Sequence, residues 1–278
     1  MILGIDAGNH RVKASGPFGV RSFYSNICDW FEREVDEQFG ADDMEFEYEG
    51  RKGFAGSIAM YEDEFGGGNM MGDTKAHEDA IIRILLAVHR YCPNYEDIYL
   101  VTGQPIKKHK EQEKRFIKEA LLGSRKITVN HEVKQFNIQG VEVAPEGSAA
   151  IWAKPTNGLV RVLDVGSGTV NAATLQDMRH INTQSDTFHF GVETVRNKDY
   201  GAMARGIIKN LSKKWNRDDV VYIVGGIAKL IAPFIQRYFP NAVVLQPEIQ
   251  KANRLTLVEP VFSNAVAFNE LAIRKFSA

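Results

Sequence analysis

The sequence predicts an α/β protein in which the second half repeats the architecture of the first, and its length fits two domains or one large domain. Apolar runs of strand length alternate with segments of helical period along most of the 278 residues. Each half begins with a strand, a tight turn and a second strand, at residues 2–14 and 160–173. The elements that follow the two hairpins come in a similar order. This order indicates an internal duplication, although the halves share little sequence.

Composition and charge are those of a soluble globular protein. Hydrophobic residues make up 44% and charged residues 25%, and a net charge of -1 favours neither nucleic acid nor a membrane as a direct partner. Asp6 comes too early for a signal peptide, and the longest apolar stretch, 80–88, contains Arg83 and is too short to span a bilayer. We therefore expect a cytoplasmic protein in which Cys28 and Cys92 form no disulfide.

After the first hairpin, extended segments continue. The sequence predicts a strand at 19–24 and a hairpin of strands 45–48 and 51–56 that turns near Gly50. The glycine-rich segment 64–72 lacks the Lys-Ser/Thr pair that follows the glycines of a P-loop. This segment therefore predicts a surface loop rather than a phosphate cradle.

Two helices are expected in the rest of the first half. One is capped by Asp73 or Thr74 and ends near Cys92-Pro93, with one apolar face formed by Ile81, Ile84, Leu85 and Val88. The other, at 106–122, is highly charged and has an inner side formed by Phe116, Ala120 and Leu121. Its basic run at 107–110 is followed by interleaved glutamates, which indicates a solvated helix face rather than a surface that binds DNA or an acidic partner.

The remaining elements alternate between strands and helices. In the first half we expect strands at 98–102, 126–132 and 140–143, then Pro145-Glu146-Gly147-Ser148 and a short helix at 149–152. In the second half we expect an extended stretch to Phe190, a helix at 192–215, a strand at 220–224 ending in Gly225-Gly226, and a helix at 227–239.

Two aspartates stand at equivalent places in the two hairpins. Asp6 and Asp164 each end a strand, and each is followed two residues later by a glycine, Gly8 or Gly166, that lets backbone N–H groups approach an anion. Because Mg²⁺ prefers oxygen ligands and keeps several waters, two such carboxylates can hold it through water against phosphates. Lys13 begins the return strand and can place its charge on the β and γ phosphates. Either Asp-x-Gly alone would indicate only a hairpin turn.

The order of five short motifs resembles that of the actin, Hsp70 and sugar kinase superfamily. There the motifs are called phosphate 1, connect 1, phosphate 2, adenosine and connect 2. Here they correspond to Asp6-Ala7-Gly8-Asn9-His10-Arg11-Val12-Lys13, Pro145-Glu146-Gly147, Asp164-Val165-Gly166-Ser167-Gly168-Thr169, Val224-Gly225-Gly226 and residues 260–268. Each motif alone is weak, whereas five in order across nearly the whole chain imply the actin-like fold, a duplicated ribonuclease H-like α/β fold of two domains with mixed sheets.

Within that superfamily, local features are most similar to the bacterial ParM-type plasmid-segregation actins. Gly103-Gln104-Pro105 resembles their Gly-x-Pro strand end. Residues 260–268 resemble their connect 2 motif, with Ser263 and Ala267 in place of Ala and Gly.

The interval from Asp164 to Gly225 is too short for the second phosphate-side subdomain, called IIB, that actin and ParM insert there. The compact AlfA-type segregation actins also lack this subdomain, so we expect it to be absent. We expect domain I to comprise 1–145 and 261–278, and domain II to comprise 146–260.

The resemblance implies catalytic roles for three acidic residues, Asp6, Asp164 and Glu146. Glu146 stands where these ATPases place a side chain that orients the attacking water, and a carboxylate there can accept its proton. The alternative for Glu146 is an acid at a helix N-terminus, favoured by the helix dipole, and both interpretations could hold together. Asn171 follows where a polar residue would complete the water site.

The resemblance also implies a set of nucleotide-binding residues. The backbone N–H groups of Ser167, Gly168 and Thr169 should face the γ phosphate, and Gly225-Gly226 should let adenosine pack against bare backbone at a helix start. Glu193 and Lys198 are candidates for purine and ribose contacts. The complete implied set is Gly8, Asn9, Lys13, Gly166, Ser167, Gly168, Thr169, Asn171, Glu193, Lys198, Gly225 and Gly226.

By this resemblance the chain is an ATPase that forms filaments and segregates low-copy plasmid DNA. ATP binding would stabilise head-to-tail contacts between copies of the chain, and hydrolysis would weaken them. The implied cofactors are Mg²⁺ and ATP, with GTP as the alternative nucleotide. The implied partners are other copies of the chain and a DNA-binding adaptor protein at a centromere-like plasmid site, without direct binding of the chain to DNA.

Two other functions are compatible with the same fold. A small-molecule kinase is one, because the length and Asp6-x-Gly8-Asn9 resemble a type III pantothenate kinase, and sugar kinases share the superfamily. Against this, His10 replaces the expected Thr, the Gly-x-Asp-Arg motif is missing, and no acidic base besides Glu146 is evident for an acceptor pocket. A scaffold that binds no nucleotide is the other.

Overall fold

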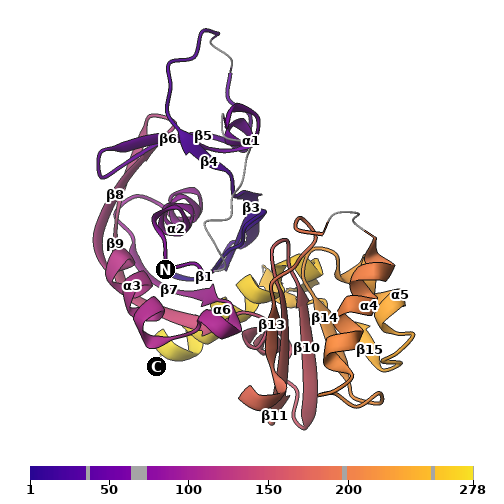
Figure 1. Cartoon of the computed structure of the whole chain (residues 1–278). Coiled ribbons are helices and arrows are strands. Elements are labelled where there is room, and N and C mark those ends of the chain that lie inside the picture. Colours follow the sequence, from indigo (N-terminus) through magenta and orange to yellow (C-terminus); the bar gives the residue numbers. More distant parts are fainter. Residues whose placement is uncertain (36–37, 64–73, 196–198, 252–253, 278) are drawn as a thin grey trace.

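The computed structural model describes residues 1–35, 38–63, 74–195, 199–251 and 254–277. The predicted loop at 64–72, Asp73 and Lys198 lie outside these residues. The described chain forms two large sheets, one in each half of the molecule (Figure 1). The α/β class and the mixed sheets are therefore confirmed.

The first sheet is mixed. The pairs β1–β7 and β7–β9 are parallel, and all other neighbouring strands of this sheet pair antiparallel. Its nine strands lie in the order β3 (Gly19–Tyr24), β2 (Arg11–Gly16), β1 (Ile2–Ala7), β7 (Asp97–Gln104), β9 (Glu132–Pro145), β8 (Gly123–Val129), β5 (Asp43–Tyr48), β6 (Arg51–Gly56) and β4 (Ile27–Asp29). The long strand β9 carries the sheet into an outer part that curves around α2 (Figure 1).

Helices cover both faces of the first sheet. On one face, α2 (Glu78–Tyr91) packs on β1, β2 and β8 around a core that includes Leu3 and Ile5. On the other face, α6 (Ser263–Phe276) packs on β1 and β7, with Val101 and Phe268 in the contact. Strand alternation turns Gly4 toward α6, where a Cβ would overlap the helix backbone. The chain end after residue 260 thus packs against the first sheet.

The second sheet is smaller and has the order β12 (Arg179–His180), β11 (Val170–Gln176), β10 (Leu159–Val165), β14 (Val221–Val224) and β15 (Ala242–Val244), with β13 (Asp186–Phe188) also paired to β11. One face packs on α4 (Tyr200–Leu211) and α5 (Ala228–Ile235), and the other on the 3₁₀ helix η2 (Ala149–Ala153). A separate hairpin of β16 (Glu248–Lys251) and β17 (Arg254–Leu257) precedes the 3₁₀ helix η4 (Pro260–Phe262).

The predicted hairpins are confirmed with small shifts. Glu49 and Gly50 have φ angles of 49° and 83°, which are the left-handed values that a two-residue hairpin turn requires. The strand expected at 126–132 is divided between β8 and β9, because Asn130 and His131 form a similar turn with φ angles of 49° and 67°.

The helices differ from the sequence pattern at their ends. The helix expected at 192–215 is shorter, because α4 begins after Asp199, whose side chain accepts hydrogen bonds from the Gly201 and Ala202 amides. The helix expected at 227–239 is also shorter, because α5 ends at Ile235. Helix α2 is capped by His77 rather than Thr74, since His77 Nδ1 accepts a hydrogen bond from the Ala80 amide.

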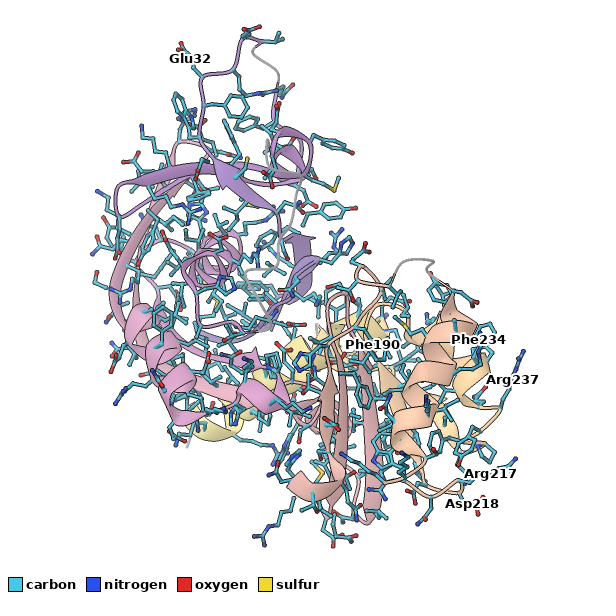
Figure 2. All side chains as sticks on the ribbon, in the orientation of Figure 1. Glu32, Phe190, Arg217, Asp218, Phe234 and Arg237 are labelled. Atoms are coloured by element: carbon cyan, nitrogen blue, oxygen red, sulfur yellow. The ribbon has the colours of Figure 1, made fainter. Side chains whose placement is uncertain are left out.

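The predicted inner side of the second helix was partly wrong. Residues 106–122 form a 3₁₀ turn η1 (Ile106–Lys108) and then α3 (Glu111–Leu121). Ile117 and Leu121, one turn apart, are the buried positions, while Phe116 is 45% exposed. A shorter α1 (Ser57–Glu62) follows β6 near the outer tip, where Figure 2 labels Glu32.

Both cysteines are free, with Cys92 buried and Cys28 partly exposed, as expected. Within the described part of the chain, no helix combines the length and the apolar character needed to cross a membrane.

Candidate functional site

A cleft of about 1020 Å³, part of it open to solvent, lies where the two sheets meet. It is lined by every described residue of the predicted site: Asp6, Gly8, Asn9, Lys13, Glu146, Asp164, Gly166, Ser167, Gly168, Thr169, Asn171, Glu193, Gly225 and Gly226. Residues distant in the sequence meet here because the carboxyl ends of β1, β10 and β14 point to the same region.

The two hairpins place their residues in matching register. Asp6 lies opposite Lys13 across β1 and β2, and Asp164 lies opposite Asn171 across β10 and β11. In the first hairpin, Lys13 Nζ is 2.7 Å from Asp6 Oδ2 and forms an ion pair with it. In the second, Asn171 is buried and its Oδ1 accepts a hydrogen bond of 2.9 Å from Thr187 Oγ1. The duplicated scaffold thus carries a cation in one copy and an amide in the other.

Glu146 is a buried carboxylate between the hairpins, with 7% of its surface exposed. Burial raises the pKa of Glu146 to about 7, the charge of Lys75 opposes this rise, and Asp6 and Asp164 add to it. Its Oε1 is buried and accepts no hydrogen bond within the described residues. A buried polar atom without a partner indicates a place for a ligand or water.

Glu146 is not a helix-terminal acid. Helix η2 starts at Ala149, has no acidic residue in its first turn and has only five residues. Because the helix dipole acts mainly on groups within the first turn, this alternative for Glu146 is wrong.

Asp164 is held by an amide that sequence reasoning did not single out. Asn264 Nδ2 donates to Asp164 Oδ2 at 3.0 Å, and Asn264 Oδ1 accepts from the Gly147 amide at 3.3 Å. Burial raises the pKa of Asp164 to about 6, although the Asn264 hydrogen bond acts in the opposite direction. Asn264 thereby connects the start of α6 to the acidic residues of the cleft.

The phosphate 2 loop is braced by the segment that was expected to be helical. The amides of Val192 and Glu193 donate to the carbonyls of Gly166 and Ser167 at 3.1 and 2.9 Å. A Cβ on Gly191 would overlap the Ser167 carbonyl, so only glycine allows this approach. Phe190, labelled in Figure 2, precedes this brace and stacks on Phe188 of β13.

Part of the cleft lining is apolar or has little side-chain bulk. Gly225 has a φ angle of 99°, and a Cβ there would overlap the Val165 carbonyl, whereas Gly226 faces open space apart from Val261 at 3.9 Å. Val192 and Ile227 also line the cleft. The cleft therefore offers a ligand both charged side chains and bare, weakly polar surface.

Lys75 was missed by sequence reasoning. It lies just before α2, is only 6% exposed, and its Nζ donates to the Ala7 carbonyl at 2.8 Å and to Asn9 Oδ1 at 3.1 Å. Its pKa is lowered by burial, against the attraction of Glu146 and Asp6. No periodicity or motif marks a single lysine in such a segment, so the sequence offered no signal for it.

The oxygen donors of the cleft fit a hydrated magnesium ion. Among the described residues there is no group of three or more His, Cys, Asp or Glu side chains placed to hold a metal. Asp6 and Asp164 both line the cleft, and two carboxylates with a phosphate and several waters are an ordinary magnesium environment. Water-mediated binding by these two residues remains a prediction.

Family comparison agrees with this geometry. Residues 4–148, more than half of the chain, match the family model for the N-terminal domain of actin-like proteins. The chain belongs to the actin-like protein family. A sequence comparison with curated proteins gave no match.

Solved structures of other actin-like proteins match along nearly the whole chain. An AlfA filament bound to AMPPNP matches with a TM-score of 0.76 and 20% identity, over 98% of this chain and 96% of that one. The filament of AlfA from a B. subtilis plasmid, pLS32, matches with a TM-score of 0.78 and 20% identity, over 95% and 96%. The ParM protein of pSK41, without nucleotide, matches with a TM-score of 0.75 and 16% identity, over 99% and 97%.

The predicted actin-like fold is thus confirmed. At these identities the structural matches show the fold alone. Between β11 and β14, the described residues of this actin-like protein form only β12, a 3₁₀ turn (Asn182–Gln184), β13 and α4. Both short strands pair with β11 of the second sheet, so the described residues there build no separate subdomain.

Proposed function

We propose that this actin-like protein is a filament-forming ATPase that segregates low-copy plasmid DNA. The observation that carries the proposal is Glu146, a buried carboxylate in a cleft that also holds Asp6 and Asp164, with one oxygen that no described residue hydrogen-bonds. Such a group is suited to orient and deprotonate a water beside a polyphosphate.

The proposal gives roles to the acidic residues of the cleft and to its two glycine-containing loops. Asp6 and Asp164 hold Mg²⁺ through water, and the ion neutralises phosphate charge when bound. The backbone of Ser167, Gly168 and Thr169 binds the γ phosphate, and Gly225-Gly226 packs against the purine. Glu193 faces the ribose, and Asn171 supports the attacking water.

Glu146 acts on that water. The water oxygen forms a bond to the γ phosphorus while the bond to the β–γ bridging oxygen breaks, and the water proton passes to Glu146. A base works best when its pKa is near the working pH, and burial raises the pKa of Glu146 to about 7.

Self-assembly is supported by the similarity to filament structures of AlfA. In the proposal, a bound triphosphate joins the two sides of the cleft and favours a head-to-tail contact between copies, and hydrolysis weakens that contact. A DNA-binding adaptor protein at a centromere-like site would connect the filament to the plasmid.

Electron microscopy and sedimentation with ATP or GTP and Mg²⁺ test the proposal. We expect filaments with at least one triphosphate, and Glu146→Ala should still form them while its phosphate release falls by about 100-fold or more. Glu142→Ala, at a half-exposed ion pair with Lys118, is the control and should behave as the wild type. A protein that never pellets, or whose ATP turnover requires pantothenate or a sugar, would contradict the proposal.

A further inference from the structure

Lys75 is a buried cation that belongs to none of the five nucleotide motifs. It comes from the segment before α2 and lines the cleft beside the phosphate 1 turn. Its ammonium has three donors, and two of them bind the neutral oxygens of Ala7 and Asn9. Within the described residues, the third donor has no protein acceptor.

Lys75 differs from the other cations of the cleft. Among the described cleft residues, Lys13 pairs with Asp6 at 2.7 Å and Arg11 with Asp42 at 3.6 Å, whereas no described carboxylate forms an ion pair with Lys75. Burying an ammonium without a carboxylate in contact costs free energy. The attraction of Glu146 and Asp6 offsets only part of this cost, because the pKa of Lys75 is still lowered by burial. An anionic ligand in the cleft would offset more of it.

The position of Lys75 is fixed together with that of Glu146. Gln104 is fully buried, and its side-chain Oε1 accepts the Lys75 amide at 2.8 Å while its main-chain carbonyl accepts the Glu146 amide at 2.8 Å. The Gln104 side chain is in turn held by Thr74 and Glu113. One residue thus places a cation and a carboxylate on the same side of the cleft.

We propose that Lys75 binds the terminal phosphate of a nucleoside triphosphate, and so is a catalytic residue of the ATPase. This rests on the proposed function. A cation beside Glu146 lies where the γ phosphate would be attacked, and it can neutralise charge that develops on the γ oxygens. Lys13, which is paired with Asp6, would bind the β phosphate as well as the γ phosphate. Lys75 would therefore distinguish triphosphate from diphosphate.

The test is nucleotide binding by Lys75→Met, which keeps the length of the side chain and removes its charge. Calorimetry with AMPPNP-Mg²⁺ should show an affinity about 10 to 100 fold lower than for the wild type, while ADP-Mg²⁺ binds within about twofold. Lys13→Met is the matched control and should weaken both nucleotides. Lys75→Met removes a buried charge, but it also removes the donor to Ala7 and Asn9 and a charge that attracts Glu146. Its unfolding midpoint is therefore measured first, and binding is compared at a temperature where the variant is folded.

Other outcomes overturn the assignment. An equal loss for both nucleotides, or no loss for either, in a folded variant would make Lys75 structural. Lys75→Gln provides the same measurements if the methionine variant does not fold. The wild type separates this proposal from the proposed function, because failure of wild-type protein to bind AMPPNP refutes the ATPase itself, whereas normal wild-type binding with an unselective variant refutes only the role of Lys75.

Discussion

Replacing Glu146 by glutamine should stabilise the nucleotide-free protein at neutral pH and above, although it removes a proposed catalytic group. The carboxylate is buried beside Asp6 and Asp164, and burial raises its pKa from the ordinary 4.5 to about 7. A folded-state pKa above the unfolded one means that folding favours the protonated form. The contribution of Glu146 to the free energy of unfolding is therefore fully present below pH 4.5 and is lost as pH rises through about 7.

The size of the effect follows from the two pKa values. Each pKa unit corresponds to about 1.4 kcal/mol, so ionised Glu146 lowers the free energy of unfolding by roughly 3 kcal/mol at pH 8. Glutamine does not titrate, so the free energy of unfolding of Glu146→Gln minus that of the wild type should rise by this amount between pH 4.5 and 8. The titration of Lys75 changes this stability difference in the same direction, because loss of the Glu146 charge lowers the folded-state pKa of Lys75 further. Asp164 titrates in both proteins, so its contribution cancels in the stability difference.

Urea unfolding of the nucleotide-free proteins, followed by tryptophan fluorescence at several pH values, measures this difference. Trp215 is buried in the second half and reports its unfolding. A Glu119→Gln change at a largely exposed position of α3 controls for the amide substitution. A difference between Glu146→Gln and wild type that stays constant from pH 5 to 8 would refute the argument that burial sets the charge of Glu146.

Two further substitutions test the close backbone approaches around the cleft. Gly191→Ala should distort the phosphate 2 loop, because its Cβ would overlap the Ser167 carbonyl, and calorimetry should show weaker nucleotide binding with a nearly unchanged unfolding midpoint. Gly4→Ala should force β1 and α6 apart, because its Cβ would overlap the helix backbone at Ala265 and Asn269, and chemical denaturation should show a loss of about 1–3 kcal/mol. Normal behaviour of either variant would contradict the stated contact.

The parts of the site that could be predicted from sequence are those fixed by local structure. A hairpin sets its own register through a short turn, so placing Asp6 near Lys13 and Asp164 near Asn171 needed only the strand pattern. The order of motifs then indicated that both hairpins share one cleft. Glu146 and Gly225 followed from the same order, and both line the cleft.

The parts that could not be predicted depend on contacts between distant segments. Lys75 reaches Asn9 across 66 positions, and Gln104 meets Lys75 across 29, and neither contact leaves a periodic pattern. The start of the helix expected at 192–215 was wrong for a related reason. The amides of Val192 and Glu193 bind the phosphate 2 loop, and these tertiary hydrogen bonds override the helical pattern.

The duplicated halves contribute different chemistry to the cleft, and this difference bears on how a nucleotide would join them. The first half supplies Lys13 and Lys75, which are side-chain cations. At the position matching Lys13, the second half has the neutral Asn171, and its phosphate loop offers backbone N–H groups instead. A γ phosphate would therefore be held by cations from one side and amides from the other. We expect its removal to break that connection, which gives hydrolysis a direct route to loosening the two halves.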